Sequence, residues 1–186
     1  MKKILSIVLM SLSLINCFNA KAEENTMTDK KVLVAYFSAT GTTAQVAKRL
    51  SETIGANLFE IKPELPYSSA DLNWMNKQSR SSIEMADRNS RPAISSKVED
   101  MEKYNIVFVG FPIWWYREPS IIDTFIQSYD FTGKIIVPFA TSGGSGMGDT
   151  SKIMQELVPQ ATVSEGKRFE ANVSAEELAQ WAKKWL

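Results

Sequence analysis

The sequence contains no histidine and a single cysteine, and these absences exclude several kinds of chemistry. Without histidine, Ser-His-Asp and Cys-His catalysis are excluded, as are most zinc sites. The cysteine is Cys17, close to the N-terminus, so the rest of the chain has no thiol for a disulfide or a nucleophile. We therefore expect any reaction here to depend on a bound cofactor.

The chain also lacks an excess of charge of either sign, since it has 21 basic and 21 acidic residues. Three of the basic residues and none of the acidic ones precede Glu23, so a chain that begins at Glu23 has a net charge near −3. Nucleic-acid binding requires a strongly basic face. The sequence therefore indicates no nucleic-acid partner.

A long hydrophobic run is found only near the N-terminus, over residues 4–15. It follows a basic start and precedes small residues at Ala20 and Ala22, an order typical of a bacterial secretory signal peptide (residues 1–22). The run is shorter than the about 20 residues of a transmembrane helix, so we expect no stable membrane insertion after cleavage. Two alternatives stay open: an uncleaved anchor, and lipid attachment at Cys17, where Asn16 replaces the usual small residue.

Cleavage after Ala22 leaves about 164 residues, enough for one domain with its own core. We interpret residues 23–30 as a polar linker and residues 31–186 as a single domain. The signal peptide predicts a periplasmic or secreted protein.

The domain alternates short apolar runs with amphipathic segments. The runs predict strands over residues 31–37, 57–61, 105–111, 134–140 and, weakly, 161–163. The amphipathic segments predict helices over residues 42–54, 119–129, 149–157 and 174–186, the last with a capping box at Ser174 and Glu177. Residues 63–97 are the least regular, and within them residues 70–87 are compatible with a helix. This alternation predicts a parallel sheet with helices on both faces.

The loop after the first predicted strand, residues 38–43, has four hydroxyl side chains and Gly41 directly before a helix. That arrangement suits a phosphate at the positive end of the helix dipole. The loop has neither the spacing nor the lysine of a nucleoside-triphosphate loop, so a monophosphate suits it better. By itself it is equally consistent with an ordinary helix cap.

Two further loops follow predicted strands. Residues 112–116 include three adjacent aromatic side chains that cannot all face one core, so at least one should be exposed and able to stack on a flat ring. The alternative is that they pack over residues 63–97. Residues 141–146 combine glycines with hydroxyls, which suits backbone contact with a ligand but is also typical of a flexible loop. Ligands of an open parallel sheet bind beyond the carboxyl ends of its strands, and together the three loops suit FMN.

These loops resemble those of the flavodoxin family, in its small quinone-reductase-like branch. The motifs are S-A-T-G-T-T at Ser38–Thr43, G-F-P-I-W-W at Gly110–Trp115 and T-S-G-G-S-G at Thr141–Gly146, and the resemblance covers residues 32–186. It implies an α/β fold: a flavodoxin-like, doubly wound, five-stranded parallel sheet of order 2-1-3-4-5 in a three-layer α/β/α sandwich.

The resemblance also implies that one FMN binds non-covalently and supplies the chemistry, with no catalytic side chain and no metal. The residues implied for the phosphate are Ser38, Thr40, Gly41, Thr42 and Thr43. Those implied for the flavin ring are Pro112, Ile113, Trp114, Trp115, Thr141, Ser142, Gly143, Gly144 and Ser145. Arg91 and Pro92 are weaker candidates, and Arg117 is expected in a solvated loop next to the ring.

Electron carriers of the family are usually strongly acidic, and many have a glycine beside the flavin. This chain is nearly neutral after cleavage, and Phe111–Ser120 contains no glycine. We therefore favour an FMN-dependent oxidoreductase that exchanges electrons with a small molecule such as a quinone. The alternatives are a one-electron carrier for a redox partner protein and a non-redox module that binds a phosphorylated ligand. A homodimer is left open, and residues 63–97 are interpreted as either a lid over the flavin or part of a dimer contact.

Overall fold

A computed structural model describes residues 31–186, so the predicted signal peptide, the linker and Cys17 lie outside the described residues. The sheet has six strands in the order β2-β1-β3-β4-β5, with β6 also paired to β4. All of these pairs are parallel. The strands are β1 (Lys31–Tyr36), β2 (Asn57–Glu60), β3 (Tyr104–Pro112), β4 (Ile135–Thr141), β5 (Thr162–Val163) and β6 (Lys167–Phe169). The predicted strand order is confirmed.

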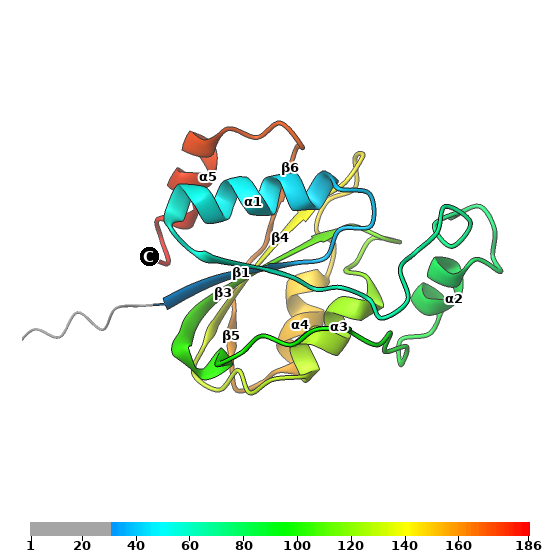
Figure 1. The fold of residues 1–186 in the computed structure, drawn as a ribbon, viewed down its shortest axis with the longest axis horizontal. Helices are drawn as coiled ribbons and strands as arrows, with labels where there is room; N and C mark the ends of the chain where they lie inside the picture. The colour runs from blue at the N-terminus through cyan, green and yellow to red at the C-terminus, as the bar shows by residue number, and fades with distance from the viewer. Residues whose placement is uncertain (1–30) are drawn as a thin grey trace, which may run out of the picture.

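Helices cover both faces of the sheet (Figure 1). On one face lie α1 (Thr42–Ile54) and α5 (Ala175–Ala182), and on the other lie α3 (Ser120–Gln127) and α4 (Thr150–Leu157). Two shorter helices, α2 (Arg80–Ala86) and the 3₁₀ helix η1 (Met101–Lys103), precede β3. The predicted bounds of α1 agree with the structure, and Gly55 ends the helix in a left-handed conformation with φ 66°.

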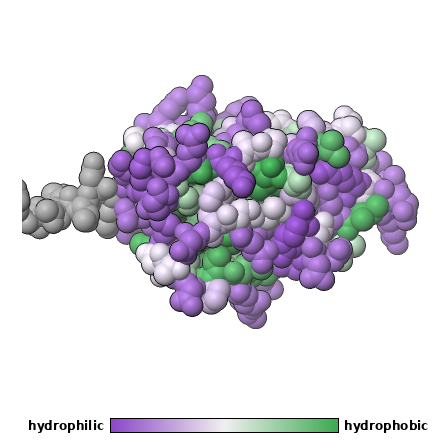
Figure 2. Space-filling view, turned by 60° about the horizontal axis from the view of Figure 1, so that its bottom comes forward, coloured by the Kyte–Doolittle hydropathy of each residue, from purple (hydrophilic) through white to green (hydrophobic). Residues whose placement is uncertain are grey.

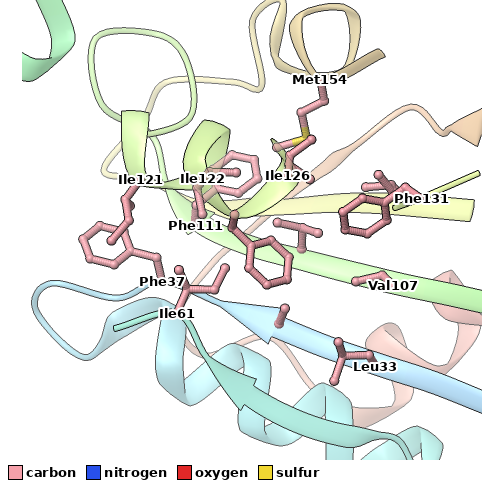
Figure 3. Close-up of a cluster of buried hydrophobic side chains, with 14 of the residues drawn as sticks. Leu33, Phe37, Ile61, Val107, Phe111, Ile121, Ile122, Ile126, Phe131 and Met154 are labelled. Atoms are coloured by element: carbon pink, nitrogen blue, oxygen red, sulfur yellow. The ribbon is translucent and has the colours of Figure 1, made fainter. Parts of the chain in front are cut away.

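The two faces of the sheet bury separate hydrophobic cores, because successive side chains of a strand point to opposite faces. Val107, Val109 and Phe111 of β3 pack against α3 and α4, whereas Ile106 and Phe108 pack against α1 and α5. Figure 3 shows the first core, where Phe37 lies beside Ile121 and Leu33 lies farther along the sheet. Burial on both faces explains why the strands read as unbroken apolar runs.

The fifth strand position is divided into β5 and β6, and β6 was not predicted. The Thr162 N–H donates to the carbonyl of Lys134, directly before β4, and the Ser164 N–H donates to the Ile136 carbonyl of β4, both at 2.9 Å. The next residue of β4 on that edge is Pro138, which has no N–H to offer the neighbouring strand. The ladder is therefore interrupted at this point and resumes where Phe139 pairs with Lys167.

The prediction that residues 70–87 are compatible with a helix is wrong for most of that range, since only Arg80–Ala86 is helical. Asp71, Asn73 and Asn76 instead accept backbone hydrogen bonds at 2.8 to 3.2 Å from residues two or three positions away. Such local side-chain bonds compete with helix formation. Residues 61–100, hereafter the excursion, thus leave the sheet after β2 and return before η1. Their two ends pair through the antiparallel bridge of Pro63 with Ile94.

The C-terminal helix is shorter than predicted, because it ends at Ala182 rather than at Leu186. Ser174 is its N-cap, and the Ser174 side chain accepts the Glu177 N–H at 3.1 Å, as expected. The Glu177 carboxylate pairs with Lys167 at 2.9 Å. The capping box is therefore formed on its serine side, while its glutamate links α5 to β6.

Candidate functional site

The loop that precedes α1 leaves the helix N-terminus open. Gly41 is the N-cap with φ 90°, and its N–H donates to the Ser38 hydroxyl at 3.1 Å. No side chain caps the helix, and its first turn contains no acidic residue. The first backbone N–H groups of a helix need acceptors, and the helix dipole favours an anion there. This end of α1 can accept a phosphate, as the sequence predicts.

The first and third predicted loops are joined by a buried hydrogen bond. The hydroxyls of Thr43 and Thr141 lie 2.8 Å apart, and both side chains are buried. One hydroxyl donates to the other, so the accepting one keeps its own proton for a further acceptor. These two threonines therefore fix the loops to each other, in addition to any contact with a ligand.

The ring loop, Pro112–Arg117, begins at the last residue of β3 and contains a tight turn. Trp114 and Arg117 exchange two backbone hydrogen bonds at 2.9 and 3.1 Å, and between them Trp115 has φ 45° and Tyr116 has φ 66°. Two successive positive φ values are typical of a type I′ turn, where Asn and Gly are preferred. The left-handed conformation costs roughly 1–2 kcal/mol at each residue with a side chain. Strain of this kind is concentrated at functional sites.

The aromatic residues of the ring loop divide between surface and core. The exposed fractions are 44% for Trp115 and 75% for Tyr116, so the prediction of at least one exposed aromatic is confirmed. Trp114 is half-buried, and its ring meets Phe37 at 5.6 Å and Tyr67 at 5.4 Å, both edge-on. Tyr67 belongs to the excursion, so the alternative interpretation, in which the aromatic residues pack over residues 63–97, holds for Trp114 alone.

The third loop and the residues that follow it contact the ring loop at two points. The Ile113 N–H donates to the Thr141 carbonyl at 2.9 Å. Gly148, with φ 54°, lies so close to the turn that a Cβ atom there would be 2.3 Å from the Tyr116 carbonyl oxygen. Within the loop, the Ser142 hydroxyl donates to the Ser145 carbonyl, while Gly143 and Gly144 are exposed. The glycines thus leave backbone accessible beside the exposed aromatics.

The three loops therefore meet at one edge of the sheet, at the carboxyl ends of β1, β3 and β4. Among the predicted residues, Thr43 and Thr141 are buried, while Thr40, Trp115, Gly143 and Gly144 are exposed. The others are half-buried: Ser38, Gly41, Thr42, Pro112, Ile113, Trp114, Ser142 and Ser145. An open helix N-terminus, an aromatic surface and an accessible backbone fit the phosphate and the flat ring of FMN.

The excursion contributes Tyr67 to the surroundings of this site, where it contacts Trp114, and the sequence did not predict this contact. The Tyr67 hydroxyl donates to the Glu84 carboxylate, and the Arg80 guanidinium lies 4.1 Å from the centre of the Tyr67 ring. Burial, and then the hydrogen bond to Glu84, raises the pKa of Tyr67. Tyr67 therefore stays protonated and supports Trp114. Its partners lie far along the chain in an irregular segment, so no periodic pattern signals it.

Arg117 was expected in a solvated loop, and this prediction is wrong, because only 7% of Arg117 is exposed. Its side chain lies against two buried acids, Glu118 and Asp123. Arg91, the weak candidate, pairs with Asp123 at 3.8 Å. It therefore belongs to the same group of charges and not to the loops themselves. The sequence shows these charges, but not that the fold brings them together.

In the part of the chain that the structure describes, residues 31–186, no helix has the length and hydrophobicity needed to cross a membrane. Within the same residues, no group of three or more histidine, cysteine, aspartate or glutamate side chains is placed to hold a metal ion.

Comparison with known proteins agrees with this geometry. A candidate flavoprotein of Bacteroides eggerthii is 46% identical with a TM-score of 0.80, covering 84% of this chain and 98% of its own. One from Bacteroides uniformis is 47% identical with a TM-score of 0.79, covering 83% and 98%. A Lactobacillus acidophilus flavoprotein, solved in complex with FMN, is 21% identical with a TM-score of 0.65, covering 84% and 98%, and shares the fold.

No curated protein matches the sequence. The sequence model of the family described as Flavodoxin matches residues 31–185, which is most of the chain and the whole of the sheet with its helices. This chain therefore belongs to the flavodoxin family.

Proposed function

We propose that this protein binds one FMN non-covalently and acts as an oxidoreductase through it. The observation that carries the proposal is the mutual bonding of three predicted loops at one sheet edge, including the 2.8 Å contact between Thr43 and Thr141. Ser38–Thr43 would hold the phosphate, and Pro112–Trp115 with Thr141–Ser145 would hold the ring. The bound flavin would supply electron and hydride transfer, while the protein binds and orients it.

Family membership and the two Bacteroides relatives support a flavoprotein. The Lactobacillus relative, whose structure contains FMN, supports this flavin in particular. Arg168 is a cation next to the third loop, where its guanidinium donates to the Ser142 carbonyl at 3.3 Å. The phosphate loop itself contains no basic residue, so binding there relies on N–H and hydroxyl donors, which suits a single phosphate.

We expect the chain from Glu23 onward to purify yellow, or to turn yellow on addition of FMN, with quenched flavin fluorescence. Ser38→Ala should weaken FMN binding about threefold to tenfold, because one hydrogen bond in the phosphate loop is worth about 0.5–1.5 kcal/mol. Fluorescence titration of the apoprotein with FMN measures both effects.

Ser174→Ala is the matched control for that titration. Ser174 accepts a backbone N–H at 3.1 Å, as Ser38 does, but it caps α5. Its replacement should leave FMN affinity unchanged. A colourless protein that leaves FMN fluorescence unchanged would contradict the proposal and favour the non-redox module that binds a phosphorylated ligand.

The proposal further assigns a small molecule, such as a quinone, as the electron partner. A mature chain with a net charge near −3 has little electrostatic steering toward a protein partner. The Trp115–Tyr116 turn has no glycine and is closed by two backbone hydrogen bonds, so it has little freedom to rearrange with the flavin's redox state.

Anaerobic reduction with dithionite should therefore proceed from the oxidised to the fully reduced spectrum through a single set of isosbestic points, as in two-electron chemistry. Free FMN under the same conditions is the control. A distinct third spectrum that accumulates midway would contradict this assignment and support a one-electron carrier for a redox partner protein.

Export is part of the proposal and rests on the sequence of residues 1–22 alone, since these lie outside the described residues. The intact mass of the protein isolated from its host should correspond to a chain that begins at Glu23. A mass that includes a lipid on Cys17 would replace this assignment with a membrane-anchored protein.

A further inference from the structure

We propose that Arg117 is a positioning residue that fastens the strained turn of the ring loop to the excursion. The inference deepens the proposed function, because this turn presents Trp115 and Tyr116 at the candidate flavin site. The attachment itself concerns only this chain's own residues, and it can be tested with or without the cofactor.

The Arg117 guanidinium joins three parts of the chain. It donates to the Glu118 carbonyl at 2.9 Å, to the Ser120 hydroxyl at 3.0 Å, and to the Met85 carbonyl at 3.5 Å. Ser120 in turn donates to the Glu84 carbonyl at 3.0 Å. Met85 and Glu84 lie in α2 of the excursion, whereas Ser120 begins α3. One side chain thus links the end of the turn, the start of α3 and α2.

Two buried acids complete this cluster. Glu118 and Asp123 are both 0% exposed, and each lies 3.6 Å from an Arg117 nitrogen. Arg88 and Arg91 of the excursion approach the same carboxylates at 3.6 to 3.8 Å. The carboxylate oxygens have no hydrogen-bond partner among the described residues. The ion pairs with arginines on two separate segments are therefore the contacts of these carboxylates that oppose the cost of burying them.

The position of Arg117 in the chain explains why this attachment matters for the turn. Its backbone closes the turn with Trp114, while its side chain is held in the protein interior. Trp115 and Tyr116, between them, have the left-handed backbone that side chains disfavour. With one end of the turn anchored, that conformation persists; without the anchor, the turn can relax to a lower-energy form.

Other hydrogen bonds of the excursion to the domain reach α3 and the residues after it rather than the ring loop. Arg91 donates to the Gln127 side chain at 2.6 Å, and the Val98 N–H donates to the Tyr129 hydroxyl at 2.7 Å. In Figure 2 the visible face is mainly hydrophilic, with small separate hydrophobic patches, one at the end where Figure 1 places the excursion. Trp74 and Met75 of the excursion are exposed rather than packed on the domain. Among residues 31–186, the excursion is connected to the ring loop through the Tyr67–Trp114 contact and through the Arg117 cluster, in which Arg117 donates to the Met85 carbonyl.

Limited trypsin digestion of the apoprotein tests the attachment, with cleavage after the exposed Lys77 followed by mass spectrometry. We expect Arg117→Met to accelerate this cleavage about tenfold and to weaken FMN binding about tenfold. Arg117→Lys keeps the charge but not the planar set of donors, so it should give intermediate values. Unchanged cleavage in a folded Arg117→Met protein would overturn the proposal.

Arg49→Met is the matched control, since Arg49 donates to the carbonyls of Ala171 and Val173 and joins α1 to the segment before α5. It should leave cleavage after Lys77 and FMN affinity within about twofold of wild type. An equal acceleration in Arg49→Met would show that lost stability, and not the Arg117 attachment, exposes the excursion.

If Arg117→Met does not fold, the triple variant Arg117→Met, Glu118→Gln, Asp123→Asn removes the uncompensated charges as well. It should fold, yet retain fast cleavage and weak FMN binding, because the attachment is still missing. If the triple variant recovers the wild-type cleavage rate and FMN affinity, Arg117 serves only to neutralise the two buried acids, and the proposal is overturned. If the wild type itself does not bind FMN, the proposed function fails while the digestion still decides the attachment.

Discussion

The free energy of unfolding of the wild-type protein should fall by about 3 kcal/mol between pH 4.5 and about 7, and Glu118→Gln should abolish most of this fall. Burial, followed by the nearby charge of Asp123, raises the pKa of Glu118 from 4.5 to about 7. The unfolded chain loses this proton first as the pH rises, so the folded state is progressively disfavoured until its own pKa is reached. A difference of about 2.5 pKa units corresponds to about 3 kcal/mol.

The sign of this effect follows from which state holds the proton. Below pH 4.5 both states are protonated, and the stabilising contribution of the neutral acid is fully present. It is lost as the pH rises through about 7. Glutamine is neutral throughout, so the variant should show a much flatter dependence. The pKa of Asp123 is also raised, first by burial, and reinforces the same trend in the wild type.

Urea unfolding at pH 5 and pH 7.5 measures this dependence. The exposed Glu165 provides the control, since Glu165→Gln should leave the wild-type slope intact. Should the wild type be equally stable at both values, the surrounding arginines must hold Glu118 ionised over the whole range. The buried cluster would then act as a set of fixed ion pairs.

Gly110→Ala is expected to destabilise the protein by about 3 kcal/mol. Gly110 pairs with Phe139 across β3 and β4. A Cβ atom at this position would lie 2.3, 2.6 and 2.9 Å from three atoms of that ring. Phe139 is fully buried and packs against Trp181 of α5, so the ring has little room to move. Overpacking of this kind costs about 1–3 kcal/mol, and three close contacts place this case at the upper end.

Thermal or urea unfolding of Gly110→Ala, Phe139→Leu and the double variant separates the clash from other effects. The double variant should be less destabilised than the sum of the single changes, because the smaller leucine leaves space for the new methyl group. Gly143→Ala is the control, since a Cβ atom there has nothing within 4 Å. If the effects of the two changes add in the double variant, the Phe139 ring is not what prevents a side chain at position 110.

The three loops could be found from the sequence because each directly follows an apolar run that forms a buried parallel strand. Strands such as β1 and β3 are covered on both faces, so their hydrophobicity is continuous and their carboxyl ends are easily located. Parallel strands bring those ends to one edge, so the Ser38–Thr43 loop and the Thr141–Gly146 loop were expected together. The order of the strands came from the resemblance of the loop motifs to the flavodoxin family.

Other features depend on contacts between distant residues. The interruption between β5 and β6 arises because Pro138 of β4 has no N–H for the neighbouring strand, which a reading of residues 161–169 alone does not show. The structure of the excursion could not be predicted because its sequence has no periodic pattern. Short polar side chains such as Asp71 and Asn73 instead accept hydrogen bonds from nearby backbone N–H groups.

The sequence by itself determined the alternation of strands and helices, the three candidate ligand loops and the choice of FMN, because these depend on local periodicity and on residue types near one another. Only the tertiary structure decided that Arg117 is buried, that it meets Asp123 and the excursion, and that Tyr67 supports Trp114. Burial and pairing of charges are set by whichever segments the fold brings together. A charged residue in a loop carries no local sign of its partners.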